Sequence, residues 1–163
     1  MVNFSWVSAQ TWTSAQLEKA NTAKDIALLT PDEKEAILYI NLCRLYPQDF
    51  LKNELVQYYG TVEHGNYVKN SPYRESLMKL LGTMQPVNAL YFDGEAYKDA
   101  KCLAKEQGES GAIGHKRKNC KADYDAECCS YGMERGKDIA MQLLIDHHVI
   151  LVGKLTDHQQ QGI

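Results

Sequence analysis

The 163-residue sequence lacks a long apolar run and lacks an excess of positive charge. No apolar stretch approaches the ~18 residues of a membrane-spanning helix, so no membrane span is expected. The net charge is −3, and the one short basic run, residues 116–118, is interpreted as a solvated loop. These absences exclude a general attraction for nucleic acid or for anionic lipid.

The short motifs that identify common enzyme classes are also missing. The sequence contains no glycine-rich phosphate loop, no G-x-S-x-G elbow and no H-E-x-x-H pair. It has no internal repeat, and its first residues lack the basic start and apolar stretch of a signal peptide, which is compatible with a mature form. The composition that remains, 44% hydrophobic and 24% charged, is typical of one ordered globular domain.

Cap residues and apolar spacing predict a largely helical chain. Thr30, Pro31 and Glu33 fit an N-cap, a first helical residue and the third position of a capping box. Pro47 is expected to end that helix. Residues 1–29 are interpreted as a helical arm. Further helices are expected at about residues 48–59, 71–82, 93–108 and 134–148.

Two details of this pattern matter for the fold. In the arm, Ser14 is expected to cap a short helix, while Trp6 and Trp12 are expected to anchor the arm to the main body. The small side chains of the helix at residues 93–108 indicate close packing. Strand signals are sparse, and the best of them is the apolar run at residues 149–152.

Five cysteines bear on the redox compartment. Cys43 and Cys102 fall within helical patterns and are interpreted as small core residues. Cys120, Cys128 and Cys129 crowd into ten residues of loop, so a disulfide from Cys120 to one of the other two is expected, because so short a loop closes at small entropic cost. A disulfide favours an oxidising compartment.

Two further groups of residues are candidates for a site. His115 with the three loop cysteines is the pattern of a zinc site, which is less favoured than a disulfide because no Cys-x-x-Cys pair is present. His115 with Glu127 could bind a divalent cation or move a proton. The triplet 146–148, Asp-His-His, is interpreted as a helix end, since neighbouring helical residues point about 100° apart and helix C-termini favour histidine.

Four segments taken in order resemble the CAP superfamily of cysteine-rich secretory proteins, antigen 5 and pathogenesis-related proteins, in its bacterial form. They read EKEAILYINLCRLYPQDF, AYKDAKCLAKEQGESGAIGHKR, AECCSYG and KDIAMQLLIDHHV. Asn41 and Arg44 match the family's N-x-x-R, His115 lies at its first cavity histidine, and Glu127 lies at its G-E-N signature. The resemblance implies an α-β-α sandwich with a cleft lined by histidines and acidic residues, in proteins that are mostly secreted. Divalent-metal binding, lipid or sterol binding and proteolysis have been suggested across the family.

The resemblance ends after Val149. Bacterial relatives continue with P-S-x-G-H-R, whereas this chain reads Ile-Leu-Val-Gly-Lys at residues 150–154, so the second cavity histidine has no counterpart. Lys154 replaces it, and His158 lies in a polar tail. Residues 149–163 are therefore expected not to complete the family's cleft.

These observations predict an α+β domain at residues 30–163, a CAP-like α-β-α sandwich that is predominantly helical with a reduced or incomplete sheet. The expected function is a binding or interaction module in a secreted, periplasmic or cell-envelope location, leaning away from catalysis, with a small apolar ligand or a protein as its partner. The alternative is a metal-assisted hydrolase that uses His115 and Glu127 with a divalent cation such as zinc. Apart from that cation, no cofactor is expected.

Overall fold

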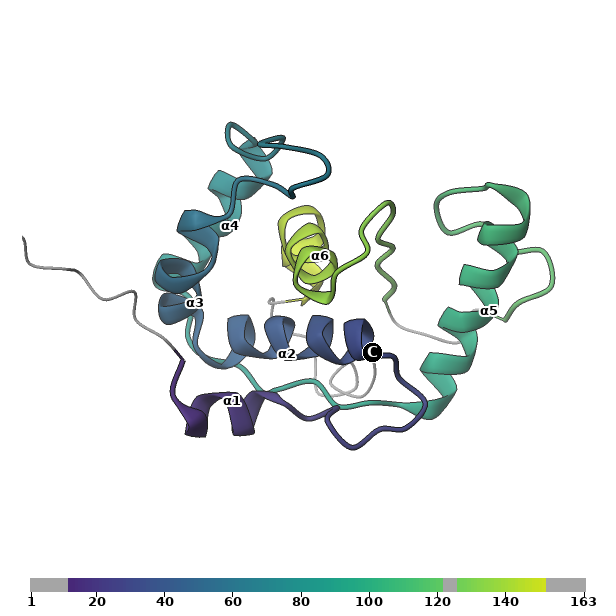
Figure 1. The fold of residues 1–163 in the computed structure, drawn as a ribbon, viewed down its shortest axis with the longest axis horizontal. Coiled ribbons are helices and arrows are strands. Elements are labelled where there is room, and N and C mark those ends of the chain that lie inside the picture. Colours follow the sequence, from purple (N-terminus) through teal and green to yellow (C-terminus); the bar gives the residue numbers. More distant parts are fainter. Residues whose placement is uncertain (1–11, 122–125, 152–163) are drawn as a thin grey trace, which may run out of the picture.

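The computed structural model describes residues 12–121 and 126–151. Within these ranges the chain is helical, and α2 runs through the centre of the molecule with α6 crossing above it (Figure 1). Helices α3 and α4 lie on one side of α2, and α5 projects on the other (Figure 1). The elements are α1 (Ser14–Ala20), α2 (Pro31–Leu45), α3 (Pro47–Asn53), the 3₁₀ helix η1 (Leu55–Gln57), α4 (Pro72–Thr83), α5 (Gly94–Ser110) and α6 (Gly136–Leu151).

Helix α2 begins as its sequence predicts. The Thr30 side chain accepts a hydrogen bond from the Glu33 backbone N–H, and the Glu33 carboxylate accepts one from the Thr30 N–H at 2.7 Å. Pro31 occupies the first turn, where its missing N–H has no partner to lose. The capping box is therefore confirmed. The helix buries its apolar side chains mainly against α6, in a core shared with α1, α3 and α4.

The start of α6 lies directly against the start of α2. The Gly136 N–H donates to the Asp32 carboxylate at 3.2 Å, and the Lys137 N–H donates to Glu35 at 3.1 Å. A Cβ atom at Gly136 would lie 2.3 Å from the Asp32 carbonyl oxygen, so this approach requires glycine. Acidic side chains of α2 thus accept hydrogen bonds from the free amides at the α6 N-terminus.

Two buried polar residues on α2 hold the extended segment 84–93, which links α4 to α5. The Asn41 side-chain amide lies 3.0 Å from the carbonyl oxygens of Ala20 and Leu90, and its oxygen accepts from the Leu90 N–H at 2.7 Å. Arg44 donates from Nε to the Asn88 carbonyl at 2.8 Å. Both side chains are at most 2% exposed. Side chains of α2 therefore provide this segment with the hydrogen-bond partners that a neighbouring strand would provide in a sheet.

A third buried polar residue fastens α4 to the end of η1. Arg74 donates to the carbonyl oxygens of Leu55, Val56 and Tyr58 at 2.9–3.0 Å. Its guanidinium also lies over the Tyr59 ring, 5.0 Å from the centroid. The acceptors lie within η1 or at its C-cap residue, Tyr58, so Arg74 supplies hydrogen-bond donors to the carbonyl groups at the C-terminal end of η1.

The expected α-β-α sandwich is wrong for the described residues. The single β contact among them is the isolated bridge between Thr61 and Gly65, and no sheet forms. The run at residues 149–152, expected as a strand, continues α6 to Leu151, while Val152 lies outside the described residues. The physical reason is that backbone groups of the extended segment 84–93 are bonded to α2 side chains rather than to another strand.

The arm and the second predicted helix differ in detail from expectation. Thr13, not Ser14, is the N-cap of α1. Trp12 donates from its indole to Glu54 at 2.6 Å, whereas Trp6 lies outside the described residues. The helix expected at residues 48–59 is divided between α3 and η1. The domain boundary at residue 30 stays a prediction.

No described helix combines the length and the apolar character that crossing a membrane would require.

The buried Asn41 gives the sharpest test of this packing. Asn41→Ala should lower the free energy of unfolding by about 2–4 kcal/mol, because buried backbone groups of Leu90 and Ala20 lose their partner. Asn66→Ala, at an exposed asparagine, is the matched control and should change it by less than about 0.5 kcal/mol. Urea unfolding measures both, and equal small effects would contradict the assigned role.

Candidate functional site

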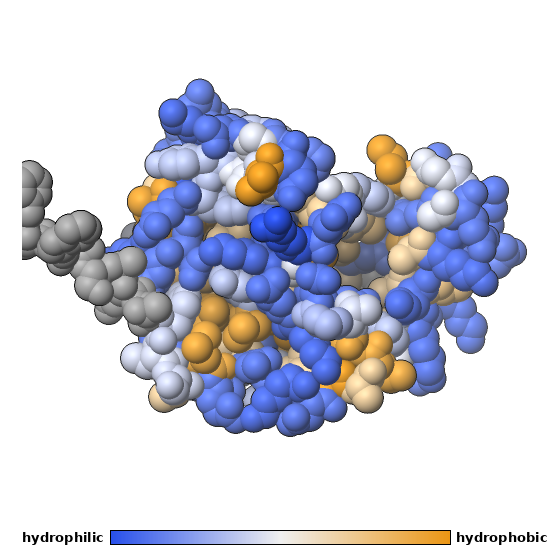
Figure 2. Space-filling view, in the orientation of Figure 1, coloured by the Kyte–Doolittle hydropathy of each residue, from blue (hydrophilic) through white to orange (hydrophobic). Residues whose placement is uncertain are grey.

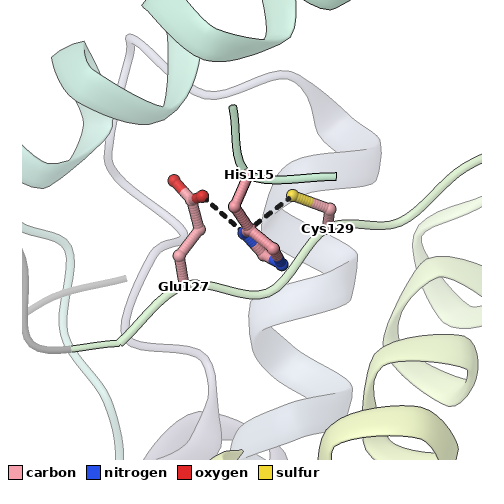
Figure 3. Close-up of side chains that lie close together, drawn as sticks. All are labelled: His115, Glu127 and Cys129. Atoms are coloured by element: carbon pink, nitrogen blue, oxygen red, sulfur yellow. Dashed lines mark hydrogen bonds and ion pairs between the residues drawn. The ribbon is translucent and has the colours of Figure 1, made fainter. Parts of the chain in front are cut away.

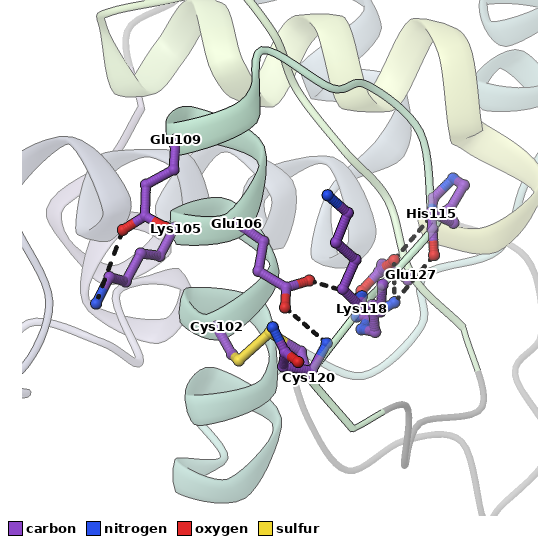
Figure 4. Close-up of a disulfide and its surroundings, with 10 residues drawn as sticks. Cys102, Lys105, Glu106, Glu109, His115, Lys118, Cys120 and Glu127 are labelled. Carbon is purple, nitrogen blue, oxygen red and sulfur yellow. Dashed lines mark hydrogen bonds and ion pairs between the residues drawn. A yellow bond between two sulfur atoms is a disulfide. The ribbon is translucent and has the colours of Figure 1, made fainter.

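The candidate site lies on a segment without regular secondary structure that follows α5. This helix ends where Gly111 adopts φ +67°, three residues beyond the predicted end at Gly108. The chain then folds back along α5, where the Glu106 carboxylate accepts hydrogen bonds from the backbone N–H groups of Lys118 and Asn119, at 3.0 and 2.7 Å. Figure 4 shows this turn beside α5. A side chain of α5 thus orders the loop that carries His115.

Tyr131 joins its own segment of the loop to the backbone next to His115. The Tyr131 hydroxyl accepts from the Gly114 N–H at 2.8 Å and from the Gln107 side chain at 3.0 Å. Gln107 also donates to the Gly114 carbonyl. These hydrogen bonds hold the Gly114 backbone and the Tyr131 side chain against α5, immediately beside the candidate site.

The cysteine pairing expected from the sequence is wrong. The disulfide joins Cys102 on α5 to Cys120, with a Cα–Cα distance of 5.7 Å (Figure 4). Cys102 therefore faces the loop and is not a core residue. The close packing expected for this helix is also wrong, because Leu103 is the only one of the described residues that α5 buries. The Glu106 contacts bring residues 118–120 to the same face of the helix, one turn from Cys102.

Three cysteines remain as free thiols. Cys43 is fully buried in the core, as its helical spacing predicts, and burial raises the pKa of its thiol. Cys128 is half-buried against the core, and burial raises its pKa to about 11. Cys129 is the thiol that lies at the candidate site. A zinc site that includes Cys120 is not formed, since its sulfur is in the disulfide.

The structure brings His115 and Glu127 together although twelve positions separate them. His115 Nδ1 lies 2.7 Å from Glu127 Oε1 (Figure 3). The histidine side chain is 50% exposed and that of the glutamate 13%. In this pair the histidine is therefore accessible to solvent, whereas the glutamate is largely enclosed.

Arg117 completes the environment of Glu127. Its two terminal nitrogens each donate to one carboxylate oxygen, the Nη1 contact to Oε1 being 3.1 Å, and its side chain is only 6% exposed. The solvated-loop interpretation is thus wrong for Arg117, whereas Lys116 and Lys118 are exposed. Burial alone raises the pKa of Glu127, but the hydrogen bonds from Arg117 and His115 outweigh it and hold the pKa below its ordinary value.

This arrangement fixes the role of each histidine nitrogen. An ionised carboxylate only accepts hydrogen bonds, so His115 must carry its proton on Nδ1 and donate it to Glu127. Cys129 Sγ lies 3.8 Å from the same nitrogen (Figure 3). Because that nitrogen is already a donor, it cannot take the thiol proton, and no Cys–His nucleophile is formed here.

Three side chains at this point are of the types that hold metal. The ligand atoms of His115, Glu127 and Cys129 lie within 4.8 Å of one another. Imidazole, carboxylate and thiolate are all zinc ligands, so the donor set fits this ion. The observed hydrogen bonds do not fit a bound ion, because His115 Nδ1 donates its proton to Glu127 and Arg117 compensates the charge of the carboxylate. The sequence pattern groups Cys129 with His115, and the structure brings these two together, whereas Arg117 as a partner of Glu127 is not evident from the sequence.

Other candidate positions lie apart from this site. Two surface pockets, of about 90 and 270 Å³, include neither His115 nor Glu127. His64 lines the smaller one and contacts the Gly132 carbonyl at 3.0 Å. Asp146 is exposed on α6. The side chains of residues 147–151 and the whole tail from residue 152, with Lys154 and His158, fall outside the described part, so the expectation for the tail stays a prediction.

Comparison of the chain with protein-family models, with curated proteins and with solved structures finds no match.

The corrected disulfide can be read directly by peptide mapping. Digestion with trypsin without reduction should give the peptide of residues 102–105 still joined by the disulfide to the peptide of residues 119–121. The variant Cys102→Ser should lower the free energy of unfolding by about 3 kcal/mol, as expected for a loop of this length. Residues 122–135 carry the other two loop cysteines and should run as an unlinked peptide. A link from residues 119–121 to that peptide would contradict the structure.

Proposed function

We propose that this chain is a CAP-like binding module that acts through the surface around His115, without hydrolytic chemistry at Glu127. The proposal is supported by the order of the sequence motifs, by the contact between His115 and Glu127, and by the apolar side chains beside them. It does not depend on a sheet, and the helical arrangement replaces the sandwich as its framework.

The observation that carries the proposal is the double compensation of Glu127. A catalytic carboxylate must accept a proton, orient water or bind a cation. Glu127 instead accepts from both terminal nitrogens of Arg117 and from His115. Charge-assisted, bidentate bonds of this kind are among the strongest hydrogen bonds in proteins, so the carboxylate is held as a structural anion.

Apolar side chains next to the site supply a binding surface. Ile113 is 76% exposed, two residues before His115, and Tyr131 is 38% exposed while its hydroxyl bonds Gly114. The surface is hollowed between α5 and the rest of the body (Figure 2). Exposed apolar groups are typical of binding surfaces, and a hollow beside them suits a small apolar ligand, since small-molecule sites are concave.

The location proposed for the module is secreted, periplasmic or in the cell envelope. The disulfide between Cys102 and Cys120 supports it, because such bonds persist in oxidising compartments. The bond also closes the loop that carries His115 onto α5, so oxidation and the order of the site are linked.

A second candidate function is a metal-assisted hydrolase. In it His115 would ligate the ion or act as a base, and Glu127 would ligate the ion or orient water. The convergence of His115, Glu127 and Cys129 favours this candidate. It requires Glu127 to leave Arg117, which is why the binding module is preferred.

A pyrene-labelled fatty acid tests the binding surface. Its fluorescence should change saturably on addition of the protein, and Ile113→Glu should weaken binding about tenfold, because burial of one isoleucine stabilises by about 1.5–3 kcal/mol. Leu28→Glu changes another exposed aliphatic residue, on the connection between α1 and α2, and should leave binding unchanged. Absence of saturable binding, or equal loss in both variants, would count against the proposed ligand class.

A further inference from the structure

The cluster of His115, Glu127 and Cys129 combines two features that oppose each other. Their ligand atoms converge within 4.8 Å, with the sulfur 3.8 Å and the carboxylate oxygen 2.7 Å from the same imidazole nitrogen. Three protein ligands and one open position are what a non-structural zinc site offers. Yet a buried guanidinium is bonded to both oxygens of the carboxylate.

We propose that His115, Glu127 and Cys129 form a three-ligand site for a soft divalent cation, and that Arg117 keeps this site closed. Arg117 thereby lowers the affinity of the site for the metal ion. The ion would bind His115 Nδ1, a Glu127 oxygen and the Cys129 thiolate. Entry of the ion requires three changes: Glu127 separates from Arg117, the imidazole proton moves from Nδ1 to Nε2, and the Cys129 thiol loses its proton to solvent.

Electrostatics explains why Arg117 opposes the ion. The guanidinium is a permanent positive charge, and its side chain is 6% exposed, so water screens it little. An ion at the cluster would meet that charge directly and would have to displace it from the carboxylate. Removing Arg117 leaves a carboxylate beside an imidazole and a thiol, with its charge compensated far less, and such a group favours a cation.

The inference concerns the same side chains as the proposed function but not its ligand. Loss of fatty-acid binding would leave the metal result untouched, and a failed metal titration would leave the apolar surface untouched. Arg117→Met is the informative variant, because methionine retains an apolar stem at a largely enclosed position while it removes the charge.

Calorimetric titration with zinc chloride, on protein whose Cys102–Cys120 bond is intact by mass spectrometry, tests the proposal. The unmodified chain should bind zinc more weakly than about micromolar, and Arg117→Met should bind at least about tenfold more tightly, the scale of a charge-assisted hydrogen bond. Lys116→Met removes the same charge from an exposed neighbour and should leave the affinity unchanged.

Cysteine variants identify the ligand. In the Arg117→Met background, Cys129→Ser should abolish the gain and Cys128→Ser should preserve it, because Cys128 is no member of the cluster. With cobalt in place of zinc, a sulfur-to-cobalt charge-transfer band should appear in Arg117→Met and in its Cys128→Ser form, and not in its Cys129→Ser form.

Three results would overturn the proposal. One is a folded Arg117→Met variant, checked by circular dichroism, that binds zinc no more tightly than the unmodified chain. Another is a gain in affinity that survives Cys129→Ser. The third is tight zinc binding by the unmodified chain, which would show that Arg117 does not close the site.

Discussion

The constraint on which the described structure depends is that its backbone must be satisfied without a sheet. Long segments between the helices carry amide and carbonyl groups that a sandwich would pair strand to strand. Here buried side chains on helices meet that demand. Asn41 and Arg44 hold the segment before α5, Arg74 holds the end of η1, and Glu106 holds the turn at residues 118–119. At the candidate site the loop is held in a different way, by hydrogen bonds between its own side chains.

This constraint explains the chemistry of the site. The loop around His115 has few apolar groups to bury, so its order comes from Arg117, Glu127, the Tyr131 hydroxyl and the disulfide to α5. A carboxylate that holds a loop in place is already fully engaged. Binding by the neighbouring apolar surface is compatible with that role, whereas water activation would need Glu127 to give up the contacts that order it.

Local signals made much of the helical structure predictable. Thr30 with Glu33, and Ser71 with Pro72, act on residues within one turn, so α2 and α4 begin as their sequences indicate. The sheet is implied by the family resemblance, with only sparse strand signals such as residues 149–152 beside it, and no sheet is present among the described residues. Helical spacing predicts a core position for Cys102, which is wrong because spacing alone does not say which face a helix buries. The short basic run predicts a solvated Arg117, because a single sequence does not reveal its tertiary partner, Glu127, ten positions away.

The state of His115 tests the central claim most directly, that Glu127 is an ionised group held by both Arg117 and His115. Nitrogen-15 NMR of the imidazole at neutral pH distinguishes its tautomers. We expect a proton fixed on Nδ1 in the unmodified chain, and a shift away from that state in Glu127→Gln. An imidazole that averages between tautomers as a free histidine does, or one protonated on Nε2 alone, would contradict it.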